Sequence, residues 1–199
     1  MDKKYTIRIL FPTLLHEYNF NEINRDEIIE YCYERKKIDE GMSYSNCGGW
    51  HSSPETIMNN NIITKTLGEG LKQSLFTSID PGCSADITYW ININPPKSYN
   101  TSHTHPDAHF SGVMWIKIPK DSGDLRFDSP HELDGYVETS SYLKEVQENT
   151  SAAGSFVITP EEGRMVTFPA SLRHDVSLNK SDEDRISISY NIRIDLTNK

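Results

Sequence analysis

Three histidines have the spacing expected of ligands to one metal ion. His103 and His105 are separated by a single residue, and side chains at positions i and i+2 of an extended backbone point the same way. His174 lies well downstream, where a later strand can bring a third imidazole to the same place. Three ligands on one face of an octahedral ion leave the opposite face open, which is the arrangement of non-haem Fe(II) oxygenases. The histidines therefore predict a metal site that can accept further ligands.

The ligand set has two possible registers. Asp107 follows His105 across Pro106, and a carboxylate is the commoner facial ligand because it partly neutralises Fe(II). One register uses His103, His105 and His174. The other replaces His103 by Asp107 and keeps His105 and His174, and the residues alone leave both open.

A polar stripe runs along the last expected strand. Arg185, Ser187, Ser189 and Asn191 fall on one face because side chains alternate along a strand, and apolar residues occupy the other face. The polar face lies either in water at a sheet edge or in a wet ligand cavity. The guanidinium fork of Arg185 suits a carboxylate, and the Ser187 hydroxyl adds a donor. We therefore predict that Arg185 and Ser187 hold the distal carboxylate of a small diacid that chelates the metal.

The elements before residue 86 are expected to be largely helical. Asn24 followed by acidic residues is typical of a helix start, and this helix should end before Gly41. A second helix is expected between Thr66 and Ser78, where leucines recur at helical spacing. Residues 5–15 alternate enough to predict a first strand that ends near Pro12.

After residue 86 the sequence changes to short β-branched and aromatic segments divided by turn residues. Strands at this spacing without long helical patterns indicate a sandwich or barrel. We therefore predict a single domain over residues 1–199, with helical support over 1–85 and a β core over 86–199. A polar insertion is expected over 134–153. The expected strands cover 87–94, 110–118, 125–127, 155–159, 164–168 and 185–194.

Composition narrows the class of protein. A chain of 199 residues can bury a stable core without disulfides or structural metals. Its three cysteines have no pairing pattern, which predicts a reducing compartment. The net charge of −9, without a long basic cluster, argues against nucleic acid as a partner. No segment has the length and apolarity of a signal peptide or membrane span. We expect a cytoplasmic protein that does not bind membranes, with its oligomeric state left open.

The motifs taken together resemble a known family, the 2-oxoglutarate/Fe(II)-dependent oxygenases common in marine bacteria and their phages. The resemblance spans most of the chain, and each motif alone is weak. It implies a mainly β fold with a double-stranded β-helix (jelly-roll) core and two N-terminal helices packed on it. It also implies Fe(II), 2-oxoglutarate and O2. The matching residues are His103-Thr104-His105-Pro106, Ser111-Gly112-Val113, Gly163, Phe168-Pro169, Leu172, His174, Val176 and Arg185 to Asn191, with Ser45 to Ser52 and Trp90 to Asn94 as further family features.

The resemblance also suggests further site residues. Relatives place ten or more residues between the second metal ligand and an aromatic pair on the next strand. Trp115 lies ten residues after His105 and eight after Asp107, which favours the register with His103. Trp115 is a candidate for the wall of the cofactor pocket, and Asn92 and Asn191 are candidate cofactor-binding residues. For Trp115 the alternative is plain core, and for Asn92 a satisfied polar group at a strand end.

The reaction implied by the resemblance is oxidative decarboxylation of 2-oxoglutarate to succinate, coupled to hydroxylation of a small molecule or protein side chain. Two other functions stay open. One is a cupin-like metal enzyme that does not use 2-oxoglutarate, although the glutamate expected four residues after His105 is absent. The other is a non-catalytic β-helix binding module with structural histidines, against which the cost of unpaired buried imidazoles speaks.

Overall fold

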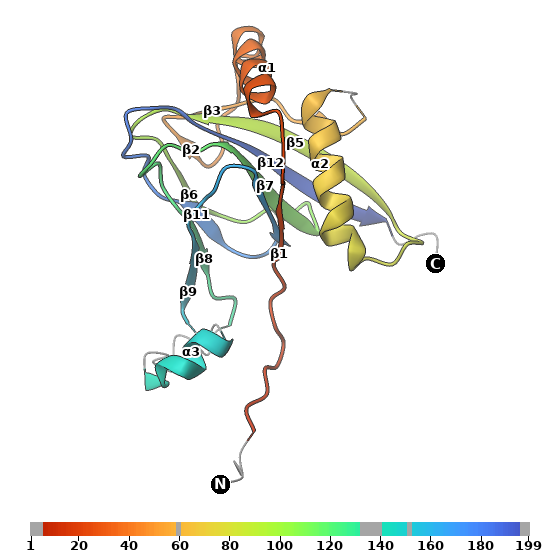
Figure 1. Cartoon of the computed structure of the whole chain (residues 1–199), viewed down its shortest axis with the longest axis vertical. Helices are drawn as coiled ribbons and strands as arrows, with labels where there is room; N and C mark the ends of the chain where they lie inside the picture. Colours follow the sequence, from red (N-terminus) through yellow and green to blue (C-terminus); the bar gives the residue numbers. More distant parts are fainter. Residues whose placement is uncertain (1–5, 59–60, 132–140, 151–152, 196–199) are drawn as a thin grey trace.

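Two antiparallel sheets form the body of the protein, and helices lie along the larger one (Figure 1). The computed structural model describes residues 6–58, 61–131, 141–150 and 153–195. The larger sheet runs in the order β1 (His16–Asn19), β10 (Arg164–Pro169), β7 (Phe110–Lys117), β12 (Arg185–Asp195), β5 (Ser84–Asn94) and β3 (Trp50–His51), with β4 (Glu55–Thr56) also paired to β5. The smaller sheet runs in the order β2 (Asn46–Cys47), β6 (Tyr99–His103), β11 (His174–Val176), β8 (Leu125–Asp128) and β9 (Ser155–Ile158).

Both N-terminal helices begin at a capping side chain. The Asn24 side chain accepts a hydrogen bond from the Glu27 amide at the start of α1 (Arg25–Ile38), as predicted. Helix α2 (Ile62–Gln73) starts earlier than expected because Asn61 forms a reciprocal capping box with Thr64. The remaining described helical segments are η1 (Leu75–Thr77) and α3 (Lys144–Thr150). No described helix is long and apolar enough to cross a membrane.

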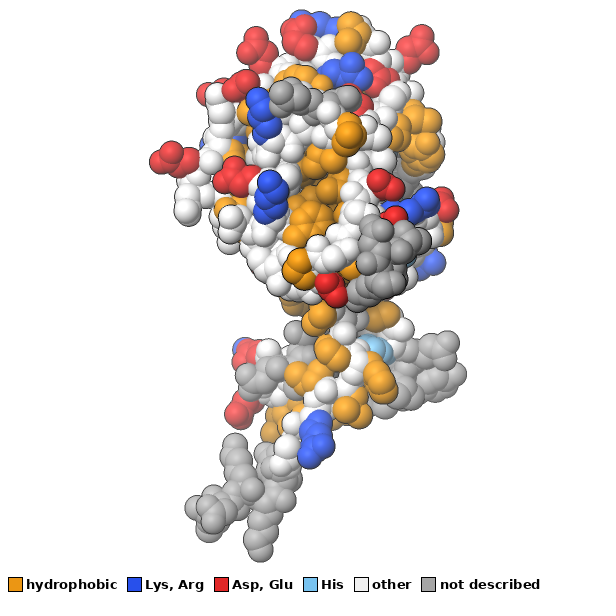
Figure 2. Space-filling view, turned by 90° about the vertical axis from the view of Figure 1, so that its right-hand side faces the viewer, with side chains coloured by type: hydrophobic (Ala, Val, Ile, Leu, Met, Phe, Trp, Pro, Cys, Tyr) orange, Lys and Arg blue, Asp and Glu red, His pale blue; other side chains and the backbone are white. Residues whose placement is uncertain are grey.

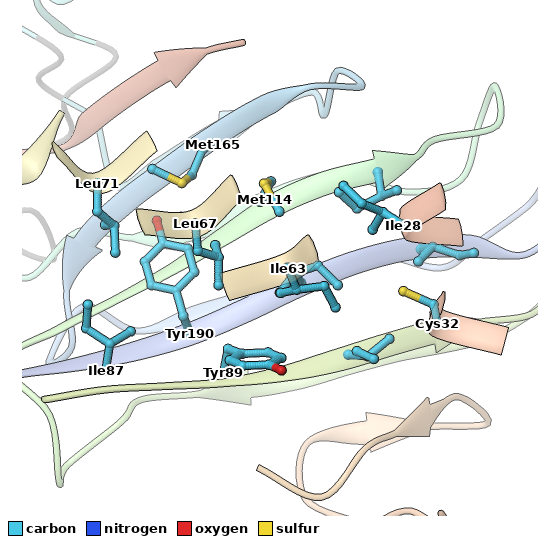
Figure 3. Packing of buried hydrophobic residues seen from close by; sticks show 14 of the residues in the cluster. Ile28, Cys32, Ile63, Leu67, Leu71, Ile87, Tyr89, Met114, Met165 and Tyr190 are labelled. Carbon is cyan, nitrogen blue, oxygen red and sulfur yellow. The ribbon is translucent and has the colours of Figure 1, made fainter. Parts of the chain in front are cut away.

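The main hydrophobic core lies between the larger sheet and the two N-terminal helices (Figure 3). Alternation along β12 directs one face into this core, and that face is completely buried: Ile186, Ile188, Tyr190 and Ile192. Because β12 lies between β7 and β5, it is not a sheet edge. Its polar face must therefore line the space between the two sheets, as the cavity alternative predicted.

Several local predictions were wrong or incomplete. Residues 6–15 form no strand, and the first strand is β1. Pro12 lacks an amide donor, and Phe11 adopts a positive φ of 56°, so this segment cannot continue a regular ladder. The part before residue 86 also supplies β2, β3 and β4 to the sheets. Residues 134–140 and 151–152 of the expected insertion over 134–153 lie outside the described residues, and the described part includes α3. The single-domain assignment stays a prediction.

Gly112 allows β7 to pack against the Tyr190 ring. A Cβ added at Gly112 would lie 2.3 Å from ring atoms of Tyr190, and Tyr190 is held by a 2.6 Å hydrogen bond with Thr167. We expect Gly112→Ala to lower the free energy of unfolding by about 1–3 kcal/mol, the usual cost of overpacking a core. Urea denaturation measures this. Gly154→Ala is the control, because no atom lies within 4 Å of its Cβ position, and equal effects of the two variants would contradict the packing explanation.

Candidate active site

The three predicted histidines meet between the two sheets. His103 ends β6, His174 begins β11, and the two residues are direct cross-strand partners. His105 follows β6 by two residues. The three imidazole ring centroids lie 4.4–5.2 Å apart, and one potential ligand atom from each residue lies within 4.8 Å of the other two. The long-range pairing of β6 with β11 thus gathers three ligands into one group.

Backbone carbonyls fix the tautomers of two of these rings. His103 Nδ1 lies 2.7 Å from the Thr101 carbonyl, and His174 Nδ1 lies 2.8 Å from the Leu172 carbonyl. Because a carbonyl only accepts, each Nδ1 carries the proton and leaves the Nε2 lone pair free. His105 Nε2 lies 3.4 Å from His174 Nε2. This donor set fits a divalent cation that imidazoles favour, such as Fe(II).

Burial keeps these imidazoles neutral. Desolvation, reinforced by the neighbouring His174, lowers the pKa of His105 to about 3. Desolvation also lowers the pKa of His174 to about 4, and it lowers the pKa of His103. At neutral pH the group therefore presents neutral ligands, and a metal ion displaces no proton from their lone pairs.

These depressed pKa values predict that the metal-free protein loses stability in mild acid. An imidazole in the unfolded chain titrates near 6.5, so between about pH 6.5 and 4 the unfolded state binds protons that folded His105 and His174 do not. The stability contribution is thus fully present above pH 6.5 and falls as pH drops toward the folded values. The melting temperature of chelator-treated protein should be lower at pH 5.5 than at pH 7. A double variant, His105→Asn with His174→Asn, should show a smaller change; an equal change would contradict the prediction.

Aromatic rings hold the histidines in place. The Phe168 ring packs edge-on against His174 at 4.8 Å, and Phe127 lies 6.0 Å from the same imidazole. On the other side the Trp90 ring lies 5.7 Å from His105. These contacts restrict the ring orientations, so the ligand geometry is organised by packing.

A buried arginine lies in the same cavity. Arg185 is only 3% exposed and, with the three histidines, lines a cavity of about 100 Å³. Its Nη1 donates to the Ser122 carbonyl at 2.5 Å, and in the described part of the chain no carboxylate forms an ion pair with it. Burial lowers the pKa of Arg185 to about 10, which leaves the guanidinium charged at neutral pH. A buried cation without a counter-ion is costly, so the cavity is suited to an anionic ligand.

The other predicted cofactor residues lie in different places. Ser187, Asn92 and Trp115 line the cavity, and the Asn92 side chain donates to Ser189 at 2.9 Å. Asn191 lies on the same face of β12 but is not among the residues that line the cavity. Its role, like those of the other cofactor-binding candidates, stays a prediction.

Asp107 lies apart from the histidine group. It is exposed in the turn after Pro106, and its backbone carbonyl accepts a hydrogen bond from Arg193. The group of potential ligands in the described chain comprises His103, His105 and His174. The geometry therefore favours the three-histidine register.

The loop over 44–52 supplies part of the cavity that the sequence indicated only in general terms. Tyr44 and Ser45 line the cavity, and Ser45 Oγ lies 3.4 Å from His103 Nε2. His51 does not belong to the group of potential metal ligands. Its ring stacks on the Trp90 ring, with the two ring centroids 5.3 Å apart. Asn100 also lines the cavity, and its position could not be predicted because the short polar strand β6 lacks the apolar alternation of a recognisable strand.

Comparison with known proteins identifies a family from the second half of the chain. The profile of the family described as "Putative 2OG-Fe(II) oxygenase" matches residues 88–191, which include the three histidines and Arg185. No curated protein matches the chain in sequence.

Solved structures share the fold at low sequence identity. A prolyl-4-hydroxylase from Pseudomonas putida aligns over 90% of this chain and 91% of its own, with a TM-score of 0.59 and 15% identity. The α-ketoglutarate-dependent epimerase SnoN of nogalamycin biosynthesis aligns over 89% and 76%, with a TM-score of 0.61 and 11% identity. HygX from Streptomyces hygroscopicus, solved with nickel and 2-oxoglutarate bound, aligns over 86% and 79%, with a TM-score of 0.55 and 9% identity. These similarities support the double-stranded β-helix core.

Proposed function

The chain belongs to the family of 2-oxoglutarate- and Fe(II)-dependent oxygenases, and from this premise we propose that it couples oxidative decarboxylation of 2-oxoglutarate to hydroxylation of a second substrate. Family membership makes it an oxidoreductase with Fe(II) and 2-oxoglutarate as cofactors. The observation that carries the finer proposal is the buried, charged Arg185, which has no carboxylate partner among the described residues and lies in the same small cavity as three neutral imidazoles.

His103, His105 and His174 would hold the metal. Their Nε2 lone pairs are available at neutral pH because burial keeps the rings uncharged. Bound Fe(II) supplies the redox chemistry that activates O2 for this reaction. The balance is 2-oxoglutarate, O2 and a C–H group giving succinate, CO2 and a C–OH group, with one oxygen atom in succinate and one in the alcohol.

Arg185 and Ser187 would bind the distal carboxylate of 2-oxoglutarate. The guanidinium offers a fork of donors to a carboxylate, and a charge-assisted bond of this kind is stronger in a dry site. Trp115 and Phe168 line the same cavity and exclude water around the pair. Arg185 and Ser187 would thus fix one end of the diacid and leave its keto-acid end for the metal held by the histidines.

The second substrate would approach from the mouth of the cavity. The enclosed volume of about 100 Å³ is well below the roughly 300–1,000 Å³ of pockets for larger ligands. Tyr44, which is exposed, and half-buried Trp90 line the cavity and can contact a substrate outside it. Either a small molecule or a protein side chain fits this arrangement.

Oxygen-dependent succinate formation tests the proposal without a known substrate. Fe(II)-loaded protein with 2-oxoglutarate in air should release succinate and CO2 in equal amounts when a reductant such as ascorbate is added, because the reductant supplies the two electrons that take the second oxygen atom to water in place of a substrate C–H group. The control is the same mixture without oxygen. If no 2-oxoglutarate is consumed although Fe(II) and 2-oxoglutarate both bind, the decarboxylation proposal fails.

A further inference from the structure

The N-terminal arm, defined here as residues 6–15, carries large apolar side chains that are mostly exposed in the described structure. Figure 1 shows this segment extending away from the two sheets, with only its inner end against the body. The exposed side chains are Ile7, Ile9, Leu10, Phe11 and Leu14, between 54% and 84% exposed. Leu15, by contrast, packs against the small core that includes Phe168 and Leu172. The arm is thus anchored at one end and apolar along its length.

A groove runs beside the arm. It has a volume of about 670 Å³ and lies between the arm, the β8–β9 hairpin and α3. Phe127 and Leu172 line it from the core, and the half-exposed Phe156 and Tyr142 also line it. Figure 2 shows hydrophobic side chains gathered on the lower part of the molecule, where Figure 1 places the arm. Contiguous apolar surface of this extent marks an interaction site more often than a free surface.

Beside this groove lies a sheet edge without a partner. Strand β9 ends the smaller sheet and pairs only with β8 in the described part of the chain. A free edge presents unpaired amide and carbonyl groups that an extended segment can pair with. The arm has a strand-like apolar sequence but pairs with no strand among the described residues. The described part of the molecule therefore has both an unpaired strand-like segment and an unpaired edge.

The backbone of the arm is also strained where it is most exposed. Phe11 has a φ of 56°, a conformation that bulky L-residues rarely adopt. Its side chain is 84% exposed, so packing within the chain does not compensate for this cost. An extended conformation of residues 6–11 along another strand would remove the strain.

From these observations we propose that two copies of this chain associate, with the arm of each copy lying in the groove and along the free β9 edge of the other. In a two-fold dimer the same surface of each copy meets the other copy. The apolar arm and the apolar groove of both copies would therefore be covered in one interface. This inference is independent of the proposed function. A membrane is a poorer occupant because the net charge of −9 opposes binding to anionic lipid.

The arm and the groove together offer apolar surface to a partner. Eight large side chains near them are 49–84% exposed: Ile7, Ile9, Leu10, Phe11, Leu14, Tyr142, Phe156 and Val157. Burial of these side chains would supply part of the roughly 800 Å² per partner that a standard specific interface buries, and pairing of the arm with the β9 edge would add backbone contacts.

Sedimentation velocity of the 199-residue chain over a range of concentrations tests the proposal. We expect a dimer of the 22.8 kDa chain that the double variant Leu10→Asp with Phe11→Asp converts to a monomer. Both side chains are exposed, so the variant should stay folded and bind 2-oxoglutarate normally, whereas its melting temperature should lose the concentration dependence that association gives. Ile38→Asp is the control, because Ile38 is equally exposed but lies at the end of α1, away from the arm (Figure 1); this variant should stay dimeric.

A mixing experiment tests whether the arm occupies the partner's groove. Phe156→Asp should also give a monomer. Mixed with the arm variant, it should form a weak heterodimer, because one intact arm then meets one intact groove. A wild-type chain that stays monomeric, or a dimer that the arm variant leaves intact, would overturn the proposal. A monomer that binds vesicles or another protein through the arm would overturn it too.

Discussion

Replacing His174 with alanine should abolish Fe(II) binding. The His174 Nε2 atom is one of the three grouped donor atoms, and its lone pair is fixed by the bond between Nδ1 and the Leu172 carbonyl. Replacing a residue that only orients a metal ligand typically lowers metal affinity about 10–100-fold. Replacing a ligand itself should lower the affinity by more than this. Anaerobic calorimetric titration with Fe(II) measures the dissociation constant, and the melting temperature checks that the variant is folded.

Asp107→Ala is the matched control for the metal ligands. Asp107 lies two residues after His105 but is exposed and outside the histidine group. This variant should bind Fe(II) with full affinity, whereas His103→Ala should lose binding. The opposite result, loss with Asp107→Ala and retention with His103→Ala, would establish the carboxylate register. Full affinity in His174→Ala would remove His174 from the site.

Arg185→Ala should chiefly weaken the binding of 2-oxoglutarate. Truncating one partner of a buried, hydrogen-bonded charge pair typically costs about 2–5 kcal/mol, which corresponds to a loss of affinity between about 30-fold and several thousand-fold. Fe(II) binding should persist because the histidines are unchanged. Titration of the metal-loaded variant with 2-oxoglutarate measures the effect.

Two further variants separate charge from geometry at this position. Arg185→Lys keeps the charge but loses the planar fork, so we expect an intermediate affinity. Arg193→Ala removes an exposed guanidinium from the same face of β12 and should bind 2-oxoglutarate normally. If Arg185→Ala retained wild-type affinity, Arg185 would not be the carboxylate-binding residue.

The helices and the longer strands could be predicted from local patterns. Asn24 identified the start of α1 because capping is a local interaction, and the β-branched residues of β5, β7 and β12 identified them as strands. The parity of β12 also separated Arg185 and Ser187 from the apolar face that fills the core. These features depend on neighbouring residues in the sequence and are therefore visible in it.

The parts that could not be predicted depend on distant pairing. Strands β6 and β11 are short and polar, and they are strands through their backbone pairing with each other and with β2 and β8 in the smaller sheet. The choice between Asp107 and His103 likewise depends on where the turn at Pro106 directs each side chain. For residues 6–15 the sequence predicted a strand that the structure does not contain, because this strand-like segment has no partner strand within the described chain.

The most direct test of cofactor binding is an anaerobic titration of the Fe(II)-loaded protein with 2-oxoglutarate, followed by visible absorption. Chelation of the metal by the keto acid should produce a weak metal-to-ligand charge-transfer band that saturates with 2-oxoglutarate. Arg185→Ala should require much more 2-oxoglutarate to reach the same band. Fe(II) binding without any such band at saturating 2-oxoglutarate would contradict the assignment of this cavity as the 2-oxoglutarate site.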